Sequence, residues 1–91
     1  MLFMAIEHYN DGALERVAER FRSSGRMLPD GVVYHASWME PSGARCFQLM
    51  ETDQPELFHR WVTFWQDLVD IEIVAVQTSS EFWAARSSAK Q

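Results

Sequence analysis

Hydrophobic and polar residues alternate along four segments of the chain, and a period of two is typical of β-strands with one face covered. Strands are therefore expected over residues 2–8, 32–39, 45–51 and 69–76. The third segment reads RCFQLME, which sends Phe47 and Leu49 to one face and Cys46, Gln48 and Met50 to the other. The pattern alone does not say whether the second face meets water or a pocket.

Two segments between these strands repeat their apolar residues every three or four positions, which predicts amphipathic helices. The first repeat consists of Leu14, Val17, Ala18 and Phe21. The second repeat consists of Leu57, Phe58, Trp61, Val62, Trp65 and Leu68. Asn10 and Asp11 are expected to cap the first helix, Asp53 the second, and Gly25 is expected to end the first.

The elements follow the order β-α-β-β-α-β, which indicates an α+β fold of the ferredoxin-like kind. This fold has a four-stranded antiparallel sheet with both helices on one face. Residues 1–78 are expected to form this single domain. Residues 79–91 form a C-terminal tail that is compatible with a short third helix, because cap-forming serines precede Phe82 and Trp83. These two aromatic residues belong either to the protomer's own core or to a contact with another subunit.

Strand parity divides the side chains of the sheet into two sets. The more apolar set is expected to face the helices, and it consists of Met4, Ile6, Tyr34, Ala36, Trp38, Phe47, Leu49, Ile71 and Ile73. The other set mixes polar and apolar groups, namely Phe3, Ala5, Glu7, Val33, His35, Ser37, Met39, Cys46, Gln48, Met50, Asp70, Glu72 and Val74. Such a mixture favours a covered but wet cavity. A turn at Ser42-Gly43 places Ser37 opposite Gln48, and a β-bulge in the hairpin would invert the parity beyond it.

Composition narrows the possible partners. The chain has 91 residues and a net charge of -5, which is the wrong sign for binding nucleic-acid phosphates. Arg16, Arg20, Arg22 and Arg26 stand among glutamates on the predicted helix and are read as a solvated mixed-charge face. The first six residues are apolar but lack a basic flank, which predicts a strand rather than a signal peptide. No apolar run is long enough to span a membrane, and a single Cys forms no internal disulfide, so the cytoplasm is the expected compartment.

The stretches MLFMAIEHYNDG, RCFQLME and WVTFWQDLVDIEIVAV resemble a family of short bacterial proteins known only as a domain of unknown function. The resemblance covers about residues 1–78 and extends to the dimeric α/β-barrel superfamily. In that superfamily, ferredoxin-like protomers dimerise through their open sheet faces and enclose a cavity. Its members include cofactor-free monooxygenases, isomerases, haem enzymes and ligand-sensing domains, so the fold by itself assigns no activity. The resemblance implies a homodimer and a cavity, and it carries over no catalytic residue.

The candidate site residues all come from the mixed set. His35 titrates near neutral pH and is the candidate catalytic acid or base, with Glu7 or Glu72 to orient it. Gln48 and Ser37 are candidate ligand-orienting groups. Cys46 would need a positive neighbour to form a thiolate, and a small buried hydrophobe is the favoured reading. His8, His35, Cys46 and Glu72 lack the close spacing of a metal site, so neither a metal nor another cofactor is expected.

Two functions are consistent with these residues. In the first, a homodimer binds a small molecule in the cavity between its two sheets, with enzymatic use left open as cofactor-free proton transfer or oxygenation. In the second, the mixed face is a dimer interface with satisfied polar groups, and the protein is a non-catalytic dimerisation or regulatory module that acts through a protein partner.

Overall fold

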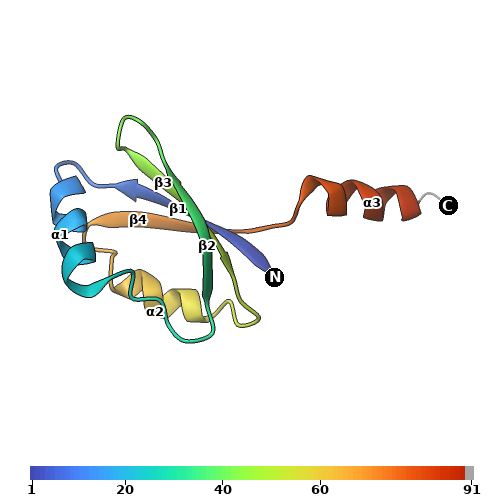
Figure 1. The fold of residues 1–91 in the computed structure, drawn as a ribbon, viewed down its shortest axis with the longest axis horizontal. Helices are drawn as coiled ribbons and strands as arrows, with labels where there is room; N and C mark the ends of the chain where they lie inside the picture. Colours follow the sequence, from blue (N-terminus) through green and yellow to red (C-terminus); the bar gives the residue numbers. More distant parts are fainter. Residues whose placement is uncertain (90–91) are drawn as a thin grey trace.

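The computed structural model describes residues 1–89. Its elements are β1 (Leu2–Tyr9), α1 (Leu14–Ser24), β2 (Val33–Met39), β3 (Arg45–Glu51), α2 (Leu57–Thr63), β4 (Val69–Val76) and α3 (Ser79–Ala89) (Figure 1). The strands lie where the alternation predicted them. The second helix is shorter than predicted, because residues 64–68 continue as turns. In the described part of the chain, no helix combines the length and the apolarity needed to cross a membrane.

The four strands form one antiparallel sheet in the order β2-β3-β1-β4, which confirms the predicted α+β ferredoxin-like fold. The predicted hairpin register is also confirmed, since Ser37 pairs with Gln48. The turn itself spans residues 41–44. The Gly43 amide donates to the Glu40 carbonyl at 2.8 Å, and Gly43 has φ +78°, a value that a glycine adopts without strain.

The core lies between the sheet and α2. Trp61 and Met50 are fully buried there, and the rings of Phe3 and Phe58 meet edge to face at 5.3 Å. Trp65 and Leu68 follow α2 and are also buried, which confirms that the tryptophans of this segment belong to a core between helix and sheet. Burial of aromatic side chains of this size supplies a large part of the stability of so small a domain.

The parity assignment is wrong for β1, for β3 and for residues 36–39 of β2. The helix-covered face carries the mixed set, and its buried members are Phe3, Ala5, Glu7, Cys46, Gln48 and Met50. The more apolar residues Met4, Ile6, Phe47 and Leu49 lie on the open face, as does Trp38, which is 54% exposed. On β4, Ile71 and Ile73 do face the helices, as predicted, and Glu72 and Val74 therefore lie on the open face.

A β-bulge explains the placement of His35. The register of β2 against β3 shifts between Tyr34 and Ala36, so His35 is an extra residue. Tyr34 pairs with Met50 and joins the helix side, whereas His35 turns to the open face, where its Nε2 lies 2.9 Å from Glu51 Oε1. The expectation that His35 and Gln48 share a face is therefore wrong.

The two helices of the layer are held differently. α2 buries Phe58 and Trp61, whereas α1 buries no residue at all. Neither helix has a side-chain cap, so the capping roles expected of Asn10, Asp11 and Asp53 are wrong. Gly25 does end α1, with φ +69° and its amide donating to the Phe21 carbonyl.

α3 projects away from the rest of the molecule (Figure 1). Phe82 and Trp83 contact each other edge to face, with ring centroids 5.0 Å apart, but they remain 41% and 61% exposed. They do not complete the hydrophobic core of the domain.

Candidate functional site

A cavity of about 370 Å³ lies between α1 and the sheet. Its volume falls within the range of about 300–1,000 Å³ that is typical of small-molecule sites. α1 forms one wall with its apolar side, through Leu14, Val17, Ala18 and Phe21. The sheet, α2 and the turn after it contribute Glu7, Tyr9, Met39, Gln48, Trp61 and Trp65, and Arg22 and Arg26 complete the lining. The cavity exists because α1 is not packed down onto the strands beneath it.

The floor of the cavity is polar although it is buried. Glu7 is 6% exposed and Gln48 is 5% exposed, and both belong to central strands. Burial raises the pKa of Glu7, against the opposing effects of hydrogen bonds from Gln48, Cys46 and Tyr9 and of the nearby Arg26 charge. The Tyr9 hydroxyl donates to Glu7 Oε1 at 3.5 Å.

Tyr9 and Cys46 share this environment. Burial, followed by the proximity of Glu7, raises the pKa of the Tyr9 phenol and of the Cys46 thiol. The surroundings therefore favour the uncharged form of all three groups. A thiol with a raised pKa is a poor nucleophile, which agrees with reading Cys46 as a small buried hydrophobe.

Arg26 enters the cavity from the loop after α1. Its carbonyl accepts hydrogen bonds from two indole nitrogens, at 2.9 Å from Trp61 and 3.1 Å from Trp65. Its Nε donates to Gln48 Oε1 at 2.8 Å. Its guanidinium carbon lies 3.8 Å from the ring centroid of Tyr34 and 5.1 Å from that of Phe21. Backbone and side chain are therefore both held in place.

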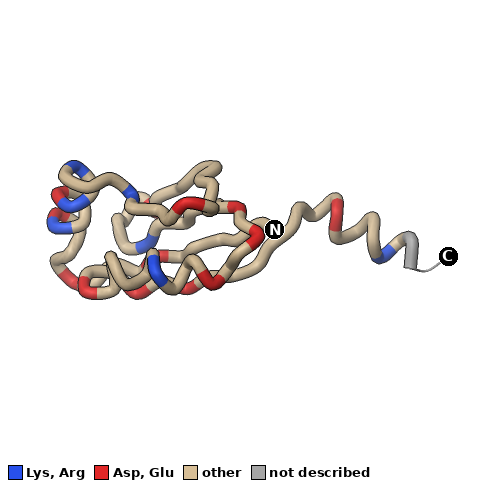
Figure 2. Tube along the Cα trace, turned by 90° about the horizontal axis from the view of Figure 1, so that it is seen from below, with Lys and Arg blue, Asp and Glu red and all other residues tan. Residues whose placement is uncertain are grey.

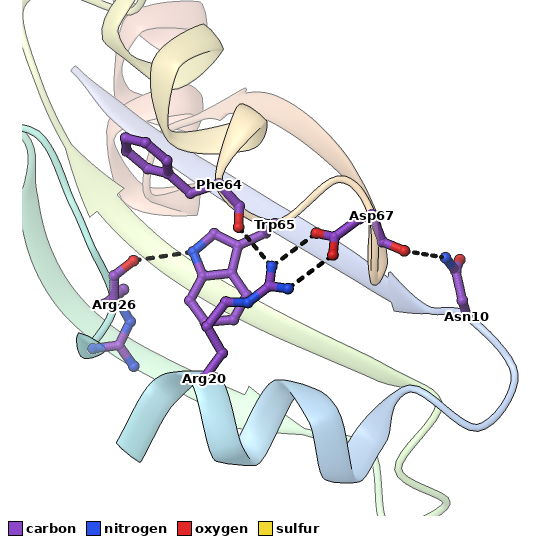
Figure 3. A network of polar contacts seen from close by, with 6 residues as sticks. All are labelled: Asn10, Arg20, Arg26, Phe64, Trp65 and Asp67. Carbon is purple, nitrogen blue, oxygen red and sulfur yellow. Dashed lines mark hydrogen bonds and ion pairs between the residues drawn. The ribbon is translucent and has the colours of Figure 1, made fainter. Parts of the chain in front are cut away.

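A second arginine ties α1 to the loop before β4 (Figure 3). Arg20 donates to both carboxylate oxygens of Asp67 at 2.8 Å and to the Phe64 carbonyl at 2.8 Å, and it stacks on Trp65 at 5.6 Å. The Arg20 guanidinium lowers the pKa of Asp67 to about 2. This contact fixes the position of α1 relative to the loop before β4, at one side of the cavity.

The predicted site residues divide between the two faces of the sheet. Glu7, Ser37, Cys46 and Gln48 lie on the helix side, and Glu7 and Gln48 line the cavity beneath α1. His35 and Glu72 lie on the open face, where His35 borders a wider hollow of about 600 Å³ together with Glu51. The sheet thus separates His35 from Glu7, one of the two carboxylates expected to orient it, whereas Glu72 lies on the same face as His35. Among the described residues, no three His, Cys, Asp or Glu side chains gather as a metal site.

Sequence reasoning missed Arg26, Tyr9 and Tyr34 as site residues. Arg26 was read with Arg16, Arg20 and Arg22 as part of a solvated helix face. The signal that separates it was present, because Gly25 ends the helix and a residue beyond the C-cap no longer follows the helical repeat. The position of Tyr34 depends on the bulge.

Comparison with known proteins identifies the family and nothing finer. A family model described as Domain of unknown function (DUF3303) matches residues 1–90. No curated protein and no solved structure matches the chain.

Proposed function

This chain belongs to the DUF3303 family, and because the description of that family states no activity, we propose from geometry that the protein binds a small molecule in the cavity beneath α1. One observation carries the proposal. The polar side chains of Glu7 and Gln48 are buried at a cavity whose opposite wall is an apolar helix side, and Leu14 and Phe21 on that helix remain 43% and 45% exposed. A bound ligand would cover the polar floor and the exposed apolar side chains of the helix.

The alternation of enclosed polar groups with apolar walls is the usual composition of a ligand site. A purely structural role for Glu7 is costly, since a buried carboxyl loses hydration and regains only part of it through its neighbours. The cavity beneath α1 replaces the inter-sheet space as the proposed site, because Glu7, Ser37, Cys46 and Gln48 face the helices.

A cavity-filling variant tests this proposal. Ala18 lines the cavity, so Ala18→Trp is expected to occupy it and abolish binding of any fragment found by NMR screening. Glu19→Trp places the same side chain at an exposed position of α1 and serves as the control. Fragment binding that survives in Ala18→Trp, or chemical shifts that move away from the cavity, would contradict the site.

Proton transfer is a second candidate function for the same cavity. The observation that favours it is a carboxyl at the cavity floor whose pKa is raised by burial, which is a frequent property of general acids and bases. Glu7 then takes the role first assigned to His35. Turnover of a ligand identified by the screen, lost in Glu7→Gln but not in His35→Ala, would support this function.

We further propose that the protein acts as a homodimer through its open sheet face. This face exposes Trp38 and Val74 and carries the half-buried Met4, Ile6, Phe47 and Leu49. Exposed apolar surface of this kind is typical of an interface. Basic groups at His8 and Arg45 and acidic groups at Asp70 and Glu72 occupy the same face, so a second copy offers charges of both signs.

The C-terminal helix supports a second copy as the partner. An isolated helix of eleven residues is marginal in water, and α3 leaves the body with its aromatic side chains exposed. Acidic residues predominate over the body of the molecule, whereas α3 shows one acidic and one basic residue (Figure 2). A neighbouring protomer would give this helix a surface on which to pack.

Sedimentation velocity tests the dimer. We expect the wild type to sediment as a dimer at micromolar concentration and Trp38→Asp to sediment as a folded monomer. Phe64→Asp alters an aromatic residue of similar exposure, 40%, at the end of α2, and it should leave the dimer intact. A wild-type monomer would contradict the homodimer without affecting the cavity proposal.

A further inference from the structure

The loop between α1 and β2 holds Arg26 in one defined position. Gly25 at φ +69° and Met27 at φ +61° flank it, and the second value is unusual for a residue with a side chain. The backbone persists in this conformation because the indole groups of Trp61 and Trp65 both donate to the Arg26 carbonyl. Two buried tryptophans therefore fix the point from which the arginine side chain starts, which is typical of a functional position.

The guanidinium is oriented as firmly as the backbone. Its Nε donates to Gln48 Oε1, and the Tyr34 ring lies against its plane. Within the described residues, no acceptor is hydrogen-bonded to the two terminal nitrogens of Arg26, and no buried side-chain nitrogen or oxygen is left without a partner. The terminal nitrogens are therefore reachable from the cavity or from solvent. A planar guanidinium presents its remaining donors in the geometry that receives a carboxylate.

The charge balance of the cavity favours a single negative charge on the ligand. An arginine side chain carries a positive charge, and Glu7, the carboxyl among the lining residues, is in surroundings that favour its uncharged form. Arg22 of α1 also lines the cavity, but its side chain is exposed, so Arg26 is the more enclosed of the two cations. The remaining lining is apolar, with Val17, Met39 and Trp65 among it. A ligand that is complementary to this surface has an apolar body and one anionic group at its end.

We infer that the cavity beneath α1 binds an apolar monocarboxylate, aromatic or aliphatic, whose carboxylate pairs with the terminal nitrogens of Arg26. The inference rests on the proposed function, because it names the chemical class of the ligand for the same cavity. In this arrangement, Gln48 positions Arg26 through Nε, and Leu14 and Phe21 cover the apolar body. The ligand gains a charge-assisted hydrogen bond that a neutral analogue of the same shape lacks.

Matched acid and amide pairs test the inference directly. Phenylacetate, 2-naphthoate and octanoate are titrated by NMR against their carboxamides, which keep the apolar body and lose the charge. For at least one pair we expect the acid to bind wild type at least about tenfold more tightly, with shifts in the residues of the cavity. The Arg26→Gln variant should bind that acid and its amide equally, while Arg16→Gln, at an exposed position of α1, should keep the preference.

The outcomes separate the two proposals. Amides that bind the wild-type cavity as well as the acids do would overturn the monocarboxylate inference and leave the cavity as a ligand site. Preferential binding of a phosphate ester or of an amine in the same cavity would also overturn it. If none of the acids shifts a cavity resonance, the inference is wrong, and if fragments of every class also fail, the proposed function is wrong with it. The wild-type comparison decides the result even where Arg26→Gln folds poorly.

Discussion

The two helices that cover the sheet meet it in opposite ways. α2 has only seven residues, yet it buries Phe58 and Trp61 in the core, although a hollow of about 560 Å³ borders its other side toward Ile71 and Ile73 of β4. α1 has eleven residues, buries none of them, and leaves a cavity of about 370 Å³ over Glu7 and Gln48. The shorter helix therefore contributes most of the packing, and the longer helix forms the wall of a site.

An amphipathic helix therefore need not pack closely against the sheet that it covers. Leu14, Val17 and Phe21 have the spacing of a core-facing stripe, but the strands below them present a carboxyl and an amide instead of a complementary apolar surface. Polar groups of this kind lose hydration when a helix closes onto them, so a gap is retained. Stability and ligand binding are consequently assigned to different ends of the same layer.

The largest expected effect is at the buried tryptophan of α2. Trp61→Ala should lower the free energy of unfolding by about 3–5 kcal/mol, because it empties a fully buried site and removes an indole donor to Arg26. Phe21→Ala on α1 should cost less than about 1 kcal/mol, since that ring is almost half exposed. Urea denaturation monitored by circular dichroism measures both. Equal costs would mean that α1 is packed as tightly as α2.

Glycine substitutions near each helix test the same difference in packing between α2 and α1. Gly31→Ala should cost about 2–3 kcal/mol, because φ is +101° and a Cβ would stand 3.1 Å from Leu57 Cδ1 of α2. Gly25→Ala at the end of α1 should cost about 1–2 kcal/mol, since φ is +69° but no atom lies within 4 Å of the added Cβ. Thermal unfolding of the two variants compares them. A larger loss at Gly25 would contradict the open packing around α1.

Glu7, beneath α1, makes the unfolding free energy of the protein depend on pH. Its pKa is raised in the folded state, so the native protein binds the proton more strongly than the unfolded chain does. The unfolding free energy should therefore decrease as pH rises from the unfolded value of 4.5 through the raised folded pKa. Glu7→Gln should remove this decrease, measured by urea titrations between pH 4 and 8.

The pH experiment has a control and a contrary result. Tyr9 and Cys46 face the same carboxyl, but their charge states do not change between pH 4 and 6. The pKa of Glu40 is lowered by Arg45 and gives a slope of the opposite sign, so the difference between wild type and Glu7→Gln reports on Glu7. An identical pH dependence of stability in wild type and Glu7→Gln would contradict the raised pKa of Glu7.

The smallest expected effect is at the ion pair that holds α1. Asp67→Asn should lower the melting temperature slightly, since the pair is largely exposed, and should speed amide exchange in α1 more than in α2. The lowered pKa of about 2 means that the stabilising contribution is present above 3.8 and is lost as pH falls through 2. Wild type and variant should therefore converge near pH 2. If amide exchange in α1 is equally fast in wild type and in Asp67→Asn at neutral pH, the ion pair with Arg20 does not hold α1 in position.

The strands, their order and the hairpin pairing follow from local rules, which explains why sequence reasoning recovered them. Alternation sets where β1 to β4 lie, and the short turn before Arg45 sets Ser37 against Gln48. The sequence also predicts which residues share a face, namely Glu7, Ser37, Cys46 and Gln48. Alternation along each strand and the pairing between strands are properties of the backbone, and together they place these residues on one side.

Which face the helices cover was decided by tertiary structure. Hydrophobicity does not report which element covers a face, so the apolar face of Met4, Ile6, Phe47 and Leu49 is expected beneath the helices, although the helices cover the other face. The bulge at His35 is equally non-local, since it depends on how β2 fits β3 near Met50. The sequence by itself determined the elements, their pairing and the polar set. The position of α1 above that set, the entry of Arg26 and the resulting cavity depend on contacts between segments far apart in the chain, which no local pattern records.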